Sequence, residues 1–264
     1  MSRVATALTI AGSDSGGGAG VQADLKTFSA LGVYGTSAIT AVTVQNTRGV
    51  SGFQVLDLPI VRGQIEAVLD DIGADAVKTG MLATAAIVET VAEIAATRGL
   101  STLVVDPVMV AKSGDRLLET SAVEAYRRAL VPRALVLTPN HGEAEVLVGR
   151  PITDGDDVRR AAGEIVAAGA RWVVMKGGHR PGPEVVDVLH DGREFWEFRS
   201  PRVETTSTHG TGCTLSSAIA AGLAHGRSLI TAIGDAKAYV TATIREGFRP
   251  GHGVGVLRHF VERW

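Results

Sequence analysis

Short runs of apolar residues alternate along this chain with longer segments rich in Ala, Glu and Arg. This alternation predicts a mostly parallel β-sheet whose strands are connected by crossover helices. The apolar runs are nearly continuous in Val, Leu and Ile, which indicates strands buried on both faces. The predicted strands are Ala7–Ala11, Thr36–Val44, Ala76–Thr79, Thr102–Asp106, Leu135–Thr138, Trp172–Lys176 and Val185–His190. The predicted helices begin near Val21, Val61, Ala85, Ser121, Gly142, Asp156, Thr214 and Ser228.

The last part of the sheet is predicted to be antiparallel. The strand Val185–His190 is followed by Asp191-Gly192 and then by the apolar run Phe195–Arg199. Asp-Gly supports a tight turn, so these segments predict a β-hairpin. No internal repeat, low-complexity tract or linker interrupts the pattern, and we predict a single domain over residues 1–264.

Composition and charge narrow the classes of function. Of the 264 residues, 45% are hydrophobic and 20% are charged, an ordinary balance for a globular α/β protein. The net charge of −2 and the absence of a Lys/Arg run disfavour nucleic acid or an anionic membrane as a partner. One cysteine, no signal peptide over Met1–Ile10 and no membrane-length apolar run predict a cytoplasmic protein.

Polar, glycine-rich or charged segments follow the first five predicted strands. The carboxyl ends of parallel strands meet at one edge of a sheet, and ligands bind outside that edge. We therefore expect the active site there, built from these segments. They are Gly12–Gly20, Gln45–Arg48, Thr79–Met81, Pro107–Asp115 and Pro139–Glu143.

The most informative segment is His209-Gly210-Thr211-Gly212-Cys213-Thr214, at the predicted start of a helix. Its glycines allow backbone angles at which successive N–H groups converge, and the helix adds its partial positive charge. Such a cradle suits the charge on a transferred phosphoryl group, and the same dipole is expected to favour the thiolate of Cys213. The alternative is that the glycines only begin a packed helix.

The loop Gly12–Gly20 is the densest glycine segment of the chain. It lacks the lysine and the spacing of a Walker A loop, and it does not match the dinucleotide-binding fingerprint. A flexible strand-to-helix turn is one interpretation. We favour a substrate-binding loop, because Asp14 and Asp24 bracket it.

Two carboxylates are expected at neighbouring strand ends. Asp106 follows one strand, and Asn140 and Glu143 follow the next at the start of a helix. Mg²⁺ usually takes one or two carboxylates together with substrate phosphates, which Asp106 and Glu143 would suit. Asn140 and Glu143 also have the spacing of a capping box, and the two roles are compatible.

Lys176 ends the sixth predicted strand and precedes two glycines. These glycines would let a phosphate approach the lysine closely, although a solvated surface charge is the alternative interpretation. The seven histidines show no spacing typical of zinc ligands, and we predict no zinc site.

Several motifs in a fixed order carry a resemblance to a known family. They are Ala7–Gly12, Gln22–Phe28, Gln45–Val50, Gly80–Leu82, Ala111–Asp115, Met175–His179, the Cys213 segment and Gly251–Gly255. Over essentially its full length the chain resembles the hydroxymethylpyrimidine/phosphomethylpyrimidine kinases of thiamine biosynthesis, within the ribokinase-like superfamily. It departs from the usual Asp-Pro-Ser-Gly-Gly-Ala-Gly in one loop, since Ser15 stands in place of the proline.

The resemblance implies a three-layer α/β/α fold, ATP as phosphoryl donor, Mg²⁺ and a homodimer. The expected substrate is 4-amino-5-hydroxymethyl-2-methylpyrimidine, converted to its monophosphate and then to the diphosphate. Gln45 would bind the pyrimidine nitrogen and amino group, in a pocket also lined by Gly12, Asp24, Met81 and Val108.

The resemblance also implies which residues act on the phosphates. Cys213 would accept the hydroxymethyl proton, and Lys112–Leu117 would form a lid. The residues expected to hold the transferred group are Gly210, Thr211, Gly212 and Lys176. The residues expected at the ATP site are Asp106, Asn140, Glu143 and Lys176, with Asp106 and Glu143 also as magnesium ligands.

Three other functions are considered. A pyridoxal kinase of the same superfamily would act on a similar ring hydroxymethyl group. A non-catalytic pyrimidine-binding regulator would not need the phosphoryl-transfer residues. A hydrolase with Cys213 as nucleophile would need His209 as its base, and no acid that would orient His209 is recognisable in the sequence.

Overall fold

The computed structural model describes residues 3–109, 120–178 and 181–262. Its main feature is an eight-stranded sheet in the order β10-β9-β8-β7-β6-β5-β1-β2. The neighbouring strands β2, β1, β5, β6, β7 and β8 are parallel, and β9 and β10 form the antiparallel hairpin predicted from the sequence. The strands are β1 (Thr6–Ala11), β2 (Tyr34–Ile39), β5 (Ala76–Thr79), β6 (Leu103–Val105), β7 (Val136–Leu137), β8 (Trp172–Met175), β9 (Glu184–His190) and β10 (Phe195–Pro201).

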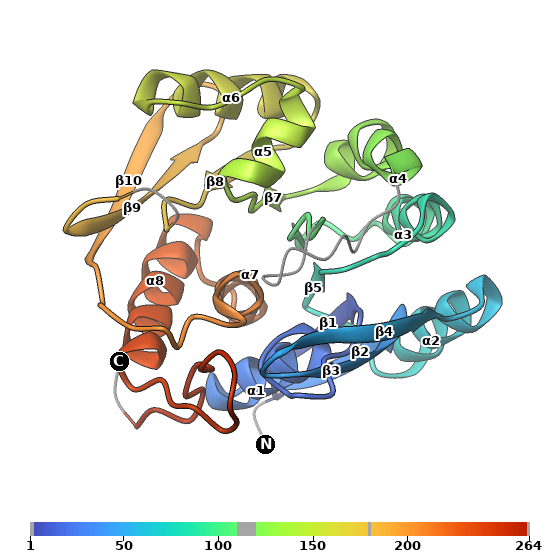
Figure 1. Ribbon diagram of the computed structural model, residues 1–264. Helices are drawn as coiled ribbons and strands as arrows, with labels where there is room; N and C mark the ends of the chain where they lie inside the picture. The colour runs from blue at the N-terminus through green and yellow to red at the C-terminus, as the bar shows by residue number, and fades with distance from the viewer. Residues whose placement is uncertain (1–2, 110–119, 179–180, 263–264) are drawn as a thin grey trace.

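Helices cover both faces of this sheet, which confirms the three-layer α/β/α fold (Figure 1). One layer consists of α1 (Gly20–Ala30), α7 (Thr211–Ala224) and α8 (Leu229–Arg245). The opposite layer consists of α2 (Leu58–Asp71), α3 (Ala85–Thr97), α4 (Thr120–Ala125), α5 (His141–Val148) and α6 (Gly155–Ala167). A π-helical turn (Tyr126–Leu130) and a 3-10 turn (Val131–Arg133) continue α4.

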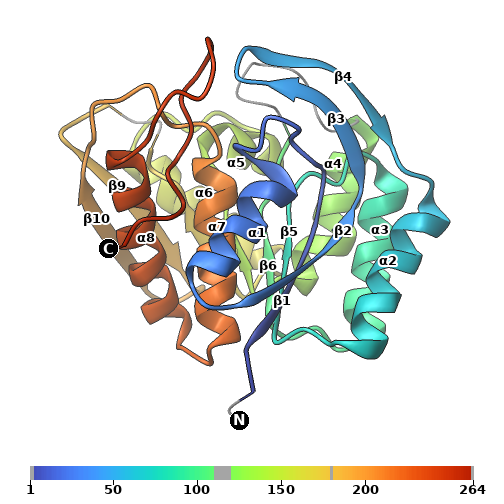
Figure 2. The same ribbon diagram turned by 90° about the horizontal axis from the view of Figure 1, so that it is seen from below.

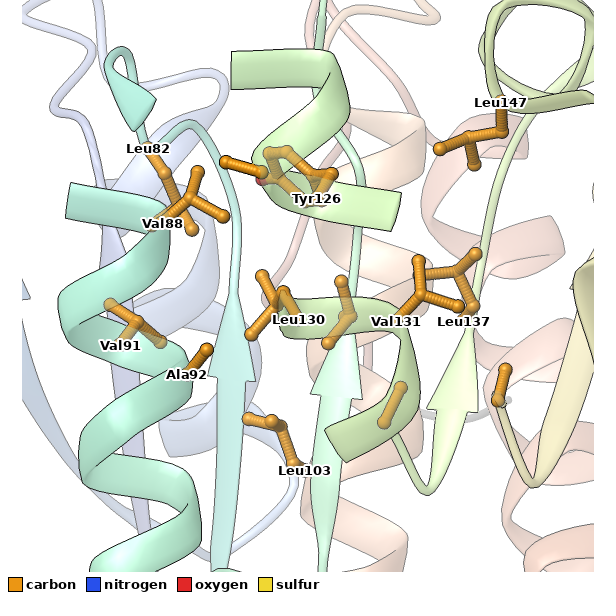
Figure 3. Packing of buried hydrophobic residues seen from close by; sticks show 14 of the residues in the cluster. Leu82, Val88, Val91, Ala92, Leu103, Tyr126, Leu130, Val131, Leu137 and Leu147 are labelled. Atoms are coloured by element: carbon orange, nitrogen blue, oxygen red, sulfur yellow. The ribbon is translucent and has the colours of Figure 1, made fainter. Parts of the chain in front are cut away.

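The strands are buried on both faces, as their continuous apolar character predicts. Leu103 and Val105 of β6 pack against the layer that contains α3, while Val104 between them packs against the layer of α7 and α8. Figure 3 shows Val88 of α3 beside Leu82 and Tyr126, and Ala92 of α3 facing Leu130 and Leu103. This double burial fixes the strand register, and with it the position of each strand end.

The predicted strand Thr36–Val44 is wrong as a single element. The strand is interrupted at Thr40, whose hydroxyl donates to the carbonyl oxygen of Met81 at 2.6 Å. Beyond it, β3 (Ala41–Asn46) leaves the main sheet and pairs with β4 (Gly49–Val55), which the sequence analysis missed. The two glycines of β4 lower its strand propensity, so the local sequence gives a weak signal. We call this two-stranded sheet, residues 41–55, the flap.

The flap is fastened to the segment that follows α8, residues 246–260. The N–H groups of Gly253 and Val254 donate to the hydroxyl and carbonyl oxygens of Thr47, at 3.0 and 2.8 Å. Figure 2 shows the C-terminal segment in red beside the end of the flap. The C-terminal segment therefore holds the tip of the flap, whose two strands pair with no strand of the main sheet within the described residues. Ser13 and Ser15 hold its first strand.

No helix of the described residues is long and apolar enough to span a bilayer. The proposed lid Lys112–Leu117 and the residue His179 lie outside the described residues.

Replacing Gly253 with alanine is expected to loosen the flap. A Cβ atom there would lie 1.8 Å from the carbonyl oxygen of Thr47, so the backbone must shift. The free energy of unfolding is expected to fall by about 1–3 kcal/mol, as for other overpacked sites. Denaturant unfolding measures this loss, and hydrogen exchange at Gly253 and Val254 reports the loosening itself.

The matched control is Gly52→Ala on β4, because nothing lies within 4 Å of a Cβ atom built there. Its stability is expected to stay within about 0.5 kcal/mol of the original protein. Equal losses in the two variants would contradict the fastening role of Gly253.

Candidate active site

A cavity of about 630 Å³ lies at the carboxyl edge of the parallel strands, between the flap and the start of α7. It contains nearly all the residues that the sequence analysis singled out, drawn from distant parts of the chain. They are Gly12, Gln45, Met81, Asp106, Val108, Asn140, Glu143, Lys176, Gly210, Thr211, Gly212 and Cys213. The prediction that the functional residues gather at this edge is confirmed.

The start of α7 has the geometry of an anion cradle. Gly210 precedes the helix with a φ of 87°, and a Cβ atom there would lie 1.8 Å from the carbonyl oxygen of Gly18. Only glycine fits this position, both in conformation and in space. The N–H groups of Gly212 and Cys213 belong to the first turn, where an α-helix offers no backbone acceptor. Both residues line the cavity, beside a positive helix end.

Lys176 lies next to this cradle, because a Cβ atom at Gly212 would be 3.3 Å from its amine. The amine is 2.8 Å from Asp106 and 3.6 Å from Glu143. Burial alone would lower the pKa of Lys176, but the two carboxylates raise it above its usual value. Lys176 is therefore a fixed cation in the cavity wall, and the interpretation as a solvated surface charge is wrong.

Both carboxylate oxygens of Asp106 accept hydrogen bonds from neighbouring side chains. One carboxylate oxygen accepts from Lys176 and from the hydroxyl of Thr138, and the other accepts from Ser216. Burial would raise the pKa of Asp106, but Lys176 and Lys78 hold it below its usual value. A metal ion would have to displace one of these partners, so the arrangement suits Asp106 to positioning Lys176 better than to binding magnesium.

Asn140 and Glu143 form the predicted capping box at the start of α5. The side chain of Asn140 accepts from the N–H of Glu143 at 3.0 Å, and Glu143 accepts from the N–H of Asn140 at 2.7 Å. This bond uses one carboxylate oxygen and leaves the second for the cavity that Glu143 lines. Burial raises the pKa of Glu143 to about 7, against the effect of Lys176. Cap and ligand roles are thus compatible here.

The environment of Cys213 differs from the prediction. Burial raises the pKa of its thiol to about 11, although Lys78 and the N–H of Gly20 act in the opposite direction. Cys213 is half-buried, and the sequence shows its helix N-terminus but not the packing around it. A pKa in this range does not agree with the expectation of a thiolate favoured at rest.

Asp24 does not line the cavity, contrary to the prediction. Its side chain is fully buried beneath it, where it accepts from Thr9 at 2.6 Å, Lys78 at 2.8 Å and Ser217 at 2.6 Å. Asp24 thus joins α1, β1, β5 and α7 one layer below the substrate space.

The sequence analysis missed the pairing of Asp14 with His209. Asp14 accepts from the N–H groups of Gly16, Gly18 and Ala19, and it lies 2.9 Å from the ring of His209. Burial would raise its pKa, but the bond with His209 lowers it below the usual value. His209 therefore does have an acidic partner, contrary to the sequence analysis. No local signal could reveal a pair 195 residues apart.

The far end of the cavity holds a second buried ion pair that the sequence did not reveal. Lys237 of α8 lies 2.8 Å from Asp187 of β9, and Asp187 also accepts from the N–H of Gly177 at 2.8 Å. This end is lined by Val185, Val203, Val240 and Ile244 together with polar groups. The cavity therefore extends from the flap, past the cradle, to a partly apolar compartment with its own cation.

Comparison with known proteins agrees with this geometry. The family model for phosphomethylpyrimidine kinase matches residues 14–258. A hydroxymethylpyrimidine/phosphomethylpyrimidine kinase of Streptomyces coelicolor is 54% identical, over 96% of this chain and 93% of the relative.

Solved structures give the same fold. An ADP complex of Bacillus subtilis pyridoxal kinase superposes with a TM-score of 0.91 at 42% identity, covering 97% of this chain and 98% of that one. Phosphomethylpyrimidine kinase from Clostridium difficile superposes with a TM-score of 0.80 at 46% identity, covering 89% and 97%. With a family match over most of its length and a relative of this identity, the chain belongs to the hydroxymethylpyrimidine/phosphomethylpyrimidine kinases.

Proposed function

We propose that this protein transfers the γ-phosphoryl group of ATP to 4-amino-5-hydroxymethyl-2-methylpyrimidine, and then a second one to the resulting monophosphate. The observation that carries the proposal is the single cavity in which the cradle of α7 and Lys176 lie between the amide of Gln45 and the compartment of Lys237. This order of groups supports an acceptor site on the flap side and a nucleotide site on the other.

The flap side fits a small aminopyrimidine. The Gln45 side chain offers one hydrogen-bond acceptor and two donors, which match a ring nitrogen beside an amino group. Gly12, Met81 and Val108 complete this part of the wall with backbone and apolar surface. A Cβ atom at Gly12 would lie 3.0 Å from the sulfur of Met81, so glycine keeps this wall thin.

In the first transfer, the hydroxymethyl oxygen bonds to the γ-phosphorus while the bond from that phosphorus to ADP breaks. The thiol of Cys213 first releases its own proton to water, and the resulting thiolate, a minor form at neutral pH, accepts the hydroxyl proton. The N–H groups of Gly212 and Cys213, together with Lys176, stabilise charge on the transferred group, which is the main requirement of phosphoryl transfer. In the second transfer the acceptor is already an anionic phosphate, so no proton acceptor is required.

Glu143 is the residue that fits magnesium. Among the described residues, no three His, Cys, Asp or Glu side chains are grouped closely enough to hold a metal ion by themselves. A single carboxylate is sufficient when the nucleotide phosphates supply the other ligands, as is usual for Mg²⁺. Bound there, the ion would neutralise charge on the phosphates.

A second candidate activity is phosphorylation of pyridoxal, favoured by the TM-score of 0.91 with Bacillus subtilis pyridoxal kinase. Incubation with MgATP and each alcohol, followed by product mass measurement, separates the alternatives. We expect the pyrimidine to give both a monophosphate and a diphosphate, with kcat/KM at least about tenfold above that for pyridoxal. A preference for pyridoxal would overturn the assignment, and turnover of neither alcohol would indicate a binding protein.

Gln45→Ala is expected to weaken pyrimidine binding but not ATP binding. Unpaired buried partners cost about 1–3 kcal/mol, which corresponds to a loss of about 5- to 150-fold in affinity. Titration calorimetry with each ligand measures it. Gln54→Ala, an exposed glutamine of the same flap, is the control and should change neither affinity. Equal losses for pyrimidine and ATP would instead indicate a folding defect.

Glu143→Gln should raise the Mg²⁺ concentration needed for half-maximal activity by at least about tenfold. Glutamine keeps an oxygen that can accept from the N–H of Asn140, so the helix cap is preserved. The measurement is the reaction rate against Mg²⁺ at fixed ATP, with pyrimidine affinity in the absence of nucleotide as the control. An unchanged magnesium requirement would leave Glu143 with the capping role alone.

We also propose that the protein is a homodimer in which the flaps cover each other. Val42 and Val44 project from the outer face of the flap and are 47% and 64% exposed. A two-stranded sheet is marginally stable alone, so an apolar partner surface would support it.

Val44→Lys should weaken this dimer by at least about tenfold, since a charge would be buried in an apolar contact. Sedimentation velocity over a range of protein concentrations measures the dissociation constant. Val146→Lys on α5, where the valine is 43% exposed, is the matched control and should have no effect. A monomeric original protein, or equal weakening by both variants, would overturn the proposed interface.

A further inference from the structure

Lys78 of β5 is a lysine with no exposed surface. Its amine lies 2.8 Å from Asp24, whose side chain is also fully buried. Taking both charges out of water is unfavourable, and a buried ion pair is often no more stabilising than apolar residues of similar size. Fold stability is therefore a weak explanation for this pair, and its position indicates another.

The pair lies directly beneath the cradle. Ala76 belongs to the cluster packed against α7 and α8, so Lys78, two residues further along β5, points toward the same layer. Its amine reaches the strand end, since a Cβ atom at Gly80 would lie 2.9 Å away. Lys78 and Cys213 both contribute to the cavity wall there. Ser217, one turn after Cys213 on α7, donates to Asp24 at 2.6 Å.

The ammonium group of Lys78 is held from one side only. Asp24 is the one hydrogen-bond acceptor that the described residues provide for it, and an ammonium carries three donors. The carboxylate thus fixes the position of the amine, and the remaining hydrogens are left for a group at the cavity floor. Gly80 keeps this space open, because any side chain there would meet the amine.

From this geometry, and granted the proposed role of Cys213, we infer that Lys78 is a positioning residue that stabilises the thiolate of Cys213 and that Asp24 holds it in place. In the first transfer the sulfur receives the hydroxyl proton of the substrate. Lys78 neither gives nor takes a proton. Its positive charge lowers the free energy of the thiolate that accepts the proton.

The charges that face Cys213 support this role. Asp24 from α1 and Asp106 after β6 raise the pKa of the thiol, and burial does so most strongly. Lys78 is the strongest influence in the opposite direction. Lys176, after β8, also interacts with Cys213, but its amine is committed to Asp106 and Glu143.

The test follows the titration of the thiol itself, which is simple because Cys213 is the single cysteine of the chain. Thiolate absorbance and alkylation by iodoacetamide are measured against pH in the full-length protein without substrate. Lys78→Met should move the titration to higher pH by at least about one unit, and should slow alkylation at a given pH about tenfold. An unchanged titration would overturn the inference.

Two further variants keep the test decisive. Lys237→Met also removes a lysine of a buried 2.8 Å ion pair in the same cavity, but at its far end, so the titration should not move. Lys78→Met combined with Asp24→Asn removes both charges and can keep the bonds to Thr9 and Ser217. If Lys78→Met alone does not fold, the double variant is expected to fold. It should shift the Cys213 titration to higher pH, but by less than Lys78→Met does. An equal shift in Lys237→Met would overturn the inference.

Kinetics separate this inference from the proposed function. Cys213→Ser should slow phosphorylation of the alcohol by about 10²- to 10⁴-fold, the usual value of general-base help, and slow the second transfer far less. Lys78→Met should reproduce this imbalance, most strongly at low pH. If Cys213→Ser slows both transfers equally, the base role fails, whereas the titration still decides whether Lys78 stabilises the thiolate.

Discussion

The ion pair between Lys176 and Asp106 fixes the geometry of the catalytic edge. Asp106 follows β6 and Lys176 follows β8, and their charged atoms meet at 2.8 Å in front of β7. Thr138, which follows β7, donates to the same carboxylate, and Ser216 attaches α7 to it. Removing one partner of such a pair leaves an uncompensated buried charge and typically costs about 3–5 kcal/mol. Three strand ends and a helix are therefore held together at one carboxylate.

This lock explains the small residues at the start of α7. A side chain at Gly212 would approach the amine of Lys176 to 3.3 Å, and one at Gly210 would collide with the carbonyl of Gly18. The helix start is thus held close both to the cation and to the loop Gly12–Gly20. The groups proposed for phosphoryl transfer are held by close packing of the backbone, which is the kind of pre-organisation that charge stabilisation requires.

The sequence predicts those parts of the protein that depend on local patterns. The strand ends followed from apolar runs, and the capping box of Asn140 and Glu143 followed from a three-residue spacing. Asp24 and Cys213 were misjudged because their environment comes from elements far away in the chain. Lys78, which affects both, lies 54 residues from Asp24. Burial and long-range pairing are properties of the packed layers, so a single-sequence pattern does not contain them.

The division between sheet and flap also bears on substrate choice. The groups proposed to bind phosphate lie at the ends of the main sheet and on α7, whereas Gln45 lies on the flap. The flap is held by Ser13 and Ser15 on one side and, through Thr47, by the C-terminal segment on the other. A changed side chain on the flap can therefore alter the proposed acceptor contacts and leave the ends of β6, β7 and β8 in place. Under the proposed function, acceptor specificity depends on residues 41–55 and the walls they face. The fold alone does not set it, since a pyridoxal kinase shares this fold with a TM-score of 0.91.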